Sequence, residues 1–185
     1  MQELVSKRAV LDEVRTSVAE ALEVDLSTVT ADSSLTGDLG AESLDFLDIN
    51  YRLEQAFGIR MARYSILDHA EEQFGEGIVL DENSRLTAQG VNLLNARYGE
   101  NAAHLKPGMS MDALPPLITV QAMADAVLDI LATYPPTCRS CTKSDWRADG
   151  TQISCGSCGE FPVFDNGDDL TVQWLKRAQE EGNIL

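Results

Sequence analysis

The sequence predicts a mainly α chain that ends in a small β module and a terminal helix. Apolar residues recur at three- and four-residue steps through most of the chain, which is the period of amphipathic helices. Two closely spaced cysteine pairs near the C-terminus flank a short segment typical of two strands around a tight turn. Pro135 and Pro136 interrupt the chain before this segment, so we expect domains at residues 1–134 and 135–185.

The composition narrows the class of partner. The formal net charge is -16 and the isoelectric point is about 4.3, which disfavours nucleic acids and anionic membranes and favours proteins with basic surfaces. No apolar run approaches membrane-spanning length, and the first residues lack the basic and apolar regions of an export signal. We therefore expect a cytoplasmic protein.

The first predicted element is a helix from Ser6 to Val24, whose buried stripe includes Val10, Val14 and Val18. A long polar loop follows from Val29 to Leu39. Leu35 is its expected apolar anchor.

The second predicted helix starts at Ser43 and ends at Gly58. Gly40 provides a flexible turn before it, and the acids on either side of Ser43 suit a helix N-terminus. Two interpretations of Ser43 are open: an ordinary N-cap, or an exposed hydroxyl with a special role. One face of the helix is expected to be buried, through Phe46, Ile49, Leu53 and Phe57.

The other face of this helix mixes acidic side chains with a few apolar ones that we expect to stay partly exposed. Such a mixture is typical of a docking surface for basic partners. The residues predicted to form it are Glu42, Leu44, Asp45, Leu47, Asp48, Tyr51 and Glu54.

The run from Asp38 to Ile49 resembles the acyl carrier protein family, with Glu42-Ser43-Leu44 in place of the family's Asp-Ser-Leu tripeptide. The resemblance implies a four-helix bundle in which Ser43 carries a 4'-phosphopantetheine arm, donated by coenzyme A through a separate transferase. The thiol of the arm would hold an acyl group as a thioester. The chemistry would then belong to the cofactor, and the chain would present the cargo and select partners.

The helix that matches the family's last one, from Ile118 to Leu131, begins about sixty residues after Phe57, which is too long for a simple connection. We therefore expect an insertion at about residues 61–117. It contains predicted helices from Tyr64 to Phe74 and from Leu86 to Tyr98, the second weakened by Gly90.

This enlarged form is similar to carriers that deliver very long acyl chains to lipid A. The insertion either widens the interior that shelters an acyl chain or changes partner choice, and both interpretations are open.

The cysteine pairs are Cys138 with Cys141 and Cys155 with Cys158. Paired C-x-x-C motifs at this separation predict a tetrahedral four-thiolate metal site, with zinc preferred and iron as the alternative. A dithiol redox centre or two disulfides are the other interpretations. The segment resembles a zinc ribbon, but its few cations do not support nucleic-acid binding.

After the ribbon, residues 161–164 are predicted to form a third strand or to pack back on it. A closing helix follows from Leu170 to Glu181. Within this helix, we expect Trp174 to dock on the ribbon rather than to contact a partner.

The predicted function is a non-catalytic acyl carrier for fatty-acid, polyketide or specialised lipid synthesis. Its expected partners are a phosphopantetheinyl transferase and acyl-ligating, acyl-transfer or ketosynthase-type enzymes with basic docking surfaces. The alternatives are a peptidyl or aminoacyl carrier and a zinc-ribbon adaptor with an unmodified scaffold. We do not expect an enzyme, since His69 and His104 have no recognisable catalytic neighbours and the four cysteines would fill a closed metal site.

Overall fold

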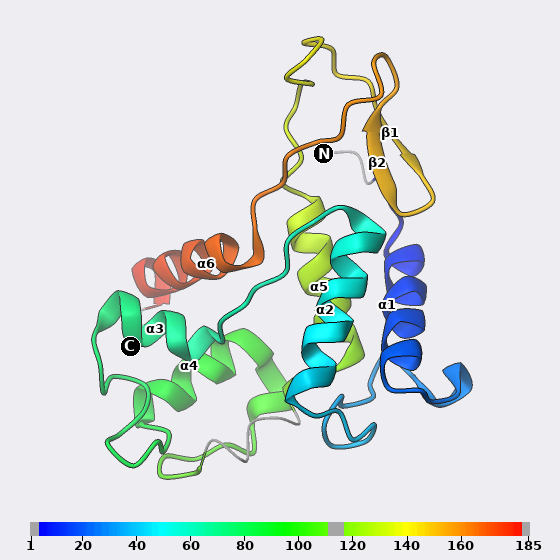
Figure 1. Ribbon diagram of the computed structural model, residues 1–185. Helices are drawn as coiled ribbons and strands as arrows, with labels where there is room; N and C mark the ends of the chain where they lie inside the picture. Colours follow the sequence, from blue (N-terminus) through cyan, green and yellow to red (C-terminus); the bar gives the residue numbers. More distant parts are fainter. Residues whose placement is uncertain (1–3, 111–116, 183–185) are drawn as a thin grey trace. The chain divides into compact units, whose positions relative to one another are not determined.

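The structure is a computed structural model that describes residues 4–110 and 117–182, and it confirms a mainly α fold with a small C-terminal sheet (Figure 1). The chain divides into two compact units. Unit 1 contains the chain up to Met61 and residues 118–167, and unit 2 contains residues 62–117 and the chain from Asp168 onward. The main elements are α1 (Lys7–Ala21), α2 (Ser43–Phe57), α3 (Ile66–Phe74), α4 (Ala88–Tyr98), α5 (Val120–Leu131), β1 (Trp146–Asp149), β2 (Gln152–Cys155) and α6 (Gly167–Gly182).

Helices α1, α2 and α5 form the core of unit 1, with α1 packed against both of the others (Figure 1). Val10, Val14 and Val18 of the stripe predicted for this part of the chain are each 0 % exposed. From α2 and α5, Leu53 and Val127 are equally buried. Burial of one apolar stripe per helix is the main stabilising contribution to such a bundle.

The loop between α1 and α2 is tied to the start of α5. Leu35, the predicted anchor, is 0 % exposed, and its backbone N–H donates to the carbonyl of Ile118 at 3.0 Å. In the other direction, the N–H of Val120 donates to the carbonyl of Ser33 at 3.0 Å. The carbonyl of Leu35 also accepts from the N–H of Ala41 at 2.8 Å. These bonds fix the backbone just before α2.

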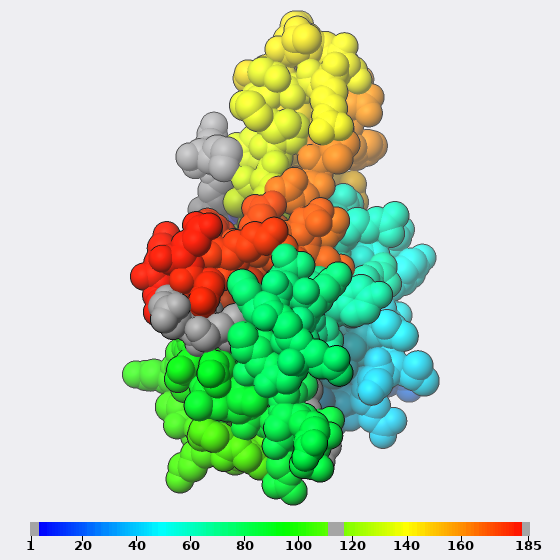
Figure 2. Space-filling model, turned by 90° about the vertical axis from the view of Figure 1, so that its left-hand side faces the viewer, coloured from blue at the N-terminus to red at the C-terminus, as the bar shows by residue number. Residues whose placement is uncertain are grey.

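Unit 2 contains α3, α4 and α6, and the space-filling view shows α6 adjoining the segment of α3 and α4 (Figure 2). Its core includes Leu67 from α3, Leu93 from α4 and Leu175 from α6. The units therefore do not coincide with the domains expected from the sequence, because α6 groups with the insertion and not with the cysteine ribbon. Trp174 likewise packs in unit 2, where the Arg97 guanidinium lies 5.2 Å from its ring centroid.

Gly90 has a packing role within α4. A β-carbon at this position would lie 2.3 Å from the carbonyl oxygen of Val79, much closer than any real contact. Glycine thus allows α4 to approach the preceding loop, which outweighs its lower helix propensity.

A buried histidine joins α3 to the start of α6. The Nε2 atom of His69 lies 2.9 Å from Asp168 Oδ1, and the His69 side chain is 7 % exposed. The same carboxylate accepts the backbone N–H groups of Arg63 and Tyr64 at 3.0 and 3.2 Å. His69, to which the sequence assigned no role, therefore belongs to a structural network.

The ribbon belongs to unit 1. Strands β1 and β2 pair antiparallel with Trp146 opposite Cys155 and Asp149 opposite Gln152. The proposed third strand at residues 161–164 is absent, and Phe161 and Val163 are exposed. Among the described residues, no helix is both long and apolar enough to span a membrane.

Candidate functional site

Ser43 is the first helical residue of α2, and the extended residue before it, Glu42, occupies the N-cap position. Gly40 reaches the left-handed φ of 72° that turns the loop into the helix. The backbone N–H of Glu42 is bonded by the Asp45 carboxylate at 2.8 Å, so Asp45 helps to cap the helix.

Ser43 is consequently released from capping. Its side chain is exposed, and within the described parts of the chain no group forms a hydrogen bond with its hydroxyl. The interpretation of Ser43 as an ordinary N-cap is wrong. A free hydroxyl beside outward-pointing N–H groups at a helix start is accessible to another protein and well placed to hold an anionic group.

The apolar residues predicted on the outer face of α2 are indeed exposed. Leu44 is 77 % exposed, Leu47 is 56 % exposed and Tyr51 is 60 % exposed. On the opposite side, Ile49 and Leu53 are 0 % exposed, as the helical period predicted. The first turns of α2 therefore present three large apolar side chains beside Ser43.

The acids on α2 are divided between the surface and the interior. Glu54, which the sequence grouped with the exposed residues, is only 7 % exposed. Its Oε1 atom accepts the backbone N–H of Met61 at 3.0 Å and its Oε2 atom lies 3.8 Å from Arg60. Glu54 thus holds the chain after α2 and does not contribute to the exposed face.

The side chain of Asp48 is 45 % exposed, and it forms an ion pair within the chain. Its carboxylate accepts from Arg52 Nε at 3.0 Å, and the same guanidinium reaches Glu20 of α1 at 2.6 Å. Sequence reasoning missed Arg52, although the i, i+4 spacing from Asp48 is the signal for such a pair. Arg52 places a cation at the end of the exposed face.

The four cysteines converge in one cluster. Their sulfur atoms all lie within 4.8 Å of one another, with 3.5 Å between Cys141 and Cys155 and 3.6 Å between Cys138 and Cys158. A disulfide requires about 2.05 Å, so all four are free thiols. Tetrahedral zinc with bonds of about 2.3 Å would separate its sulfurs by about 3.8 Å, which fits this cluster.

The two cysteine knuckles share one backbone plan. The N–H of the first cysteine in each pair, Cys138 or Cys155, donates to the carbonyl five residues later at 2.8 Å. The carbonyl of the same cysteine accepts the N–H four residues later, from Thr142 or Gly159, both in the left-handed region. This repeated turn directs both sulfurs of each pair to one point.

The pKa values of the clustered thiols are shifted in opposite directions. Burial raises the pKa of Cys155, but the backbone N–H of Ser157 and the thiols of Cys141 and Cys158 outweigh burial and lower that pKa to about 7. The backbone N–H of Glu160 lowers the pKa of Cys158, whereas burial and the other three thiols together raise it to about 12. A bound cation would allow all four to ionise together.

Comparisons with known proteins match the part of the chain that contains Ser43. The family model described as "Phosphopantetheine attachment site" matches residues 12–78, which include all of α2 and α3. Acyl carrier protein AcpXL of Brucella melitensis is 39 % identical over 71 residues, which are 38 % of this chain and 72 % of that protein. AcpXL of Rhizobium etli is 38 % identical over 74 residues, covering 40 % and 76 %.

A shorter match reaches the acyl carrier protein of Treponema pallidum, with 50 % identity over 46 residues, 25 % of this chain and 59 % of that protein. No solved structure matches. The cysteine ribbon lies outside the residues that match the family model, so its likeness to a zinc ribbon rests on its own geometry. The two AcpXL proteins are 39 % and 38 % identical to this chain over 72 % and 76 % of their own length. The chain therefore belongs to the acyl carrier protein family.

Proposed function

We propose that Ser43 is the attachment point of a 4'-phosphopantetheine arm, whose thiol carries an acyl group as a thioester. The observation that carries this proposal is the exposed, unpartnered hydroxyl at the first position of α2, inside the stretch that resembles phosphopantetheine attachment sites. The N–H groups and dipole at the helix start favour the phosphodiester anion that the arm would introduce.

The exposed face of α2 supports recognition by basic enzymes. Leu44, Leu47 and Tyr51 offer apolar contact area next to Ser43, and Glu42, Asp45 and Asp48 add negative charge. A formal charge of -16 would steer a basic partner toward the chain. The proposed partners are a phosphopantetheinyl transferase and acyl-ligating, acyl-transfer or ketosynthase-type enzymes, each bound briefly so that cargo can be exchanged.

For the cargo, we favour acyl groups of fatty-acid, polyketide or specialised lipid synthesis. The relatives described above are named acyl carrier proteins, and two are the AcpXL form. A peptidyl or aminoacyl carrier, which uses the same arm, is the alternative within the class. Acyl carrier proteins are carriers rather than catalysts, and the proposal requires no reactive side chain beyond the Ser43 hydroxyl.

We also propose that Cys138, Cys141, Cys155 and Cys158 bind one metal ion, with zinc preferred and iron as the alternative. The spacing of the four sulfurs supports a closed tetrahedral site with no open position for a substrate. The metal would thus be structural. The alternative to a carrier is a zinc-ribbon adaptor whose helical bundle is not modified, because the same four-cysteine site would suit an adaptor equally well.

The carrier proposal is tested by incubating the purified chain with coenzyme A and a broad-specificity phosphopantetheinyl transferase. Intact mass spectrometry should show the gain of one phosphopantetheinyl group, and Ser43→Ala should abolish it. Because the Ser43 hydroxyl supports no hydrogen bond in the described structure, Ser43→Ala should leave the melting temperature nearly unchanged.

Ser65→Ala is the matched control. Its hydroxyl caps α3 through the N–H of Asp68 at 3.1 Å, so this variant should lose about 1 kcal/mol of stability and keep full loading. Equal loading of the wild type and Ser43→Ala, or no loading of either, would exclude Ser43 as the attachment point and favour the adaptor.

A further inference from the structure

The C-terminal end of α2 is bonded by side chains that come from the ribbon. A helix leaves its last four carbonyl groups without partners inside the helix. Near the end of α2, the carbonyl of Ala56 accepts the Thr151 hydroxyl at 2.7 Å and the Gln152 side-chain amide at 3.1 Å. The carbonyl of Gln55 accepts the same amide at 2.9 Å. Two of the orphan carbonyls are thus satisfied from a segment about 95 residues away.

The hairpin geometry explains why these two residues are available. Gly150 has a φ of 61°, which closes the tight turn between β1 and β2. Thr151 lies in that turn, and Gln152 is the first residue of β2, paired with Asp149. Cys155, one of the four clustered thiols, ends the same short strand. The position of the capping groups is therefore set by the strand that carries a metal ligand.

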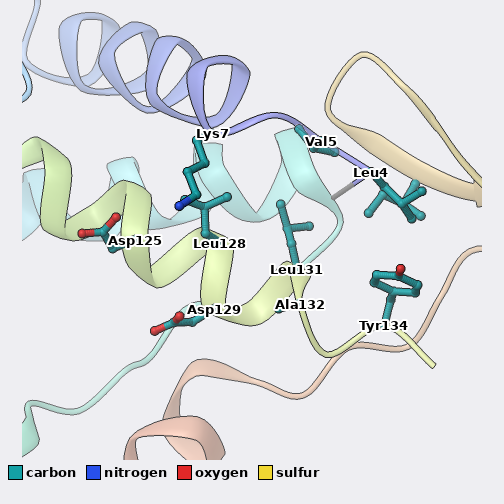
Figure 3. Close-up of a pocket in the computed structure, with 10 residues that line it drawn as sticks. Leu4, Val5, Lys7, Asp125, Leu128, Asp129, Leu131, Ala132 and Tyr134 are labelled. Atoms are coloured by element: carbon teal, nitrogen blue, oxygen red, sulfur yellow. The ribbon is translucent and has the colours of Figure 1, made fainter. Parts of the chain in front are cut away.

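The ribbon and the bundle also line one cavity together. Ile153, between Gln152 and Cys155, is 3 % exposed and lines a cavity of about 380 Å³. Leu128 and Leu131 of α5 line the same cavity, as do Leu4 and Val5 ahead of α1 (Figure 3). Gln152 of β2 and Thr151 of the preceding turn thus bond the end of α2, and Ile153 of β2 lines a cavity together with α5 and the segment ahead of α1.

We propose that the ribbon is an intramolecular cap for the C-terminal end of α2, and that metal binding by its cysteines keeps this cap in place. The two-stranded ribbon is too small to be stable alone, so metal would supply much of its folding free energy. Loss of metal would release Thr151 and Gln152 and allow the last turn of α2 to fray. This inference rests on the metal part of the proposed function, and it is independent of the arm on Ser43.

Hydrogen exchange measured by mass spectrometry on the full-length, metal-loaded chain tests the proposal. The double variant Thr151→Val, Gln152→Leu removes the three capping bonds but keeps all four cysteines, and metal content is measured in parallel. In peptides covering residues 53–58, exchange should rise about tenfold in this variant, the size expected for losing such bonds. Ser154→Ala lies further along β2, where the side chain forms no hydrogen bond with α2 in the described structure, so it is the matched control and should match the wild type.

Chelation completes the test. Removing metal from the wild type should accelerate exchange at residues 53–58 by a similar factor, and chelating the double variant should add no further increase there. An equal increase on chelation in both proteins, or residues 53–58 that stay protected after bound metal has been removed from the wild type, would overturn the cap. Failure of the metal proposal can be distinguished from failure of the cap. A chain purified without zinc or iron would show no effect of chelation, while the double variant would still show faster exchange at residues 53–58.

Discussion

At the level of single residues, the position of Ser43 one step inside α2 decides what its hydroxyl can do. The N-cap position belongs to Glu42, and Asp45 bonds the N–H of Glu42 at 2.8 Å. The sequence indicated a helix start at Ser43, but it did not separate the N-cap from the first helical residue, because serine and glutamate both occur at helix starts. Only the backbone conformation of Glu42 excludes the interpretation of Ser43 as the N-cap.

Gly90→Ala is expected to change the free energy of unfolding in the direction opposite to that usual for a helical glycine. Replacing a helical glycine with alanine normally stabilises a helix by about 1 kcal/mol. Gly90→Ala should instead destabilise unit 2 by about 1–3 kcal/mol, because the new β-carbon would press on the Val79 carbonyl. Denaturant unfolding monitored by tryptophan fluorescence, to which Trp174 in unit 2 contributes, would measure the change. A more stable Gly90→Ala variant would contradict the close approach of α4 to this loop.

Asp168 predicts a pH dependence. Burial raises its pKa, but hydrogen bonds from His69 and from the N–H groups of Arg63 and Tyr64 outweigh burial and lower the pKa below its usual value. A carboxylate with a lowered folded-state pKa stabilises the fold above the unfolded pKa of about 3.9, and that contribution is lost as the pH falls through the folded value.

Asp168→Ala should therefore destabilise the chain by about 1–3 kcal/mol at pH 7. The difference from the wild type should shrink as the pH is lowered below about 4. Melting temperatures of both proteins across this range would show the trend. A difference that stays constant down to pH 2 would mean that the carboxylate charge is not what stabilises this network.

At the level of elements, the helical period predicted which face of α2 is buried but not the fate of each polar residue on it. Ile49 and Leu53 are buried and Leu44 and Leu47 exposed, as expected. Glu54 was misplaced because its partner, the N–H of Met61, lies beyond the helix end, where periodicity carries no information. The end of α2 at Gly58 was predictable because many helices end at a glycine in the left-handed conformation, and Gly58 has such a φ of 69°.

Two leucines of α2 separate docking from folding. Leu47 is 56 % exposed, so Leu47→Ala should leave the melting temperature nearly unchanged and reduce the rate of loading by the transferase. Leu53 is 0 % exposed, so Leu53→Ala should destabilise the fold by about 2–5 kcal/mol. Loading assays below the melting temperature of both variants would compare them. Unchanged loading of Leu47→Ala would remove Leu47 from the docking surface.

At the level of the whole molecule, local patterns located nearly every element but not how the elements group. The cysteine spacing predicted the four-sulfur cluster because its geometry is local to two knuckles. The grouping of α6 with the insertion depends on contacts such as His69 with Asp168, which are 99 residues apart, and on burial of Leu175. No single segment encodes such contacts, so the domain boundaries drawn from Pro135 and Pro136 missed them.

The division into two units predicts a local response to chelation. The four cysteines belong to unit 1, whereas Leu93 and Leu175 belong to the core of unit 2. Metal removal should increase hydrogen exchange throughout residues 138–158 and leave peptides from α4 and α6 protected. Elemental analysis should find about one zinc or iron per chain. Unfolding of both units on chelation would show that the metal supports the entire chain.

The central claim, a carrier whose arm is attached at Ser43, is tested most directly on protein purified from its native host. Intact mass spectrometry followed by fragmentation should find one phosphopantetheinyl group, with or without an acyl thioester, on the peptide that contains Ser43. The mass of the acyl group would identify the cargo at the same time. Native protein whose Ser43 peptide has only its unmodified mass would contradict the account.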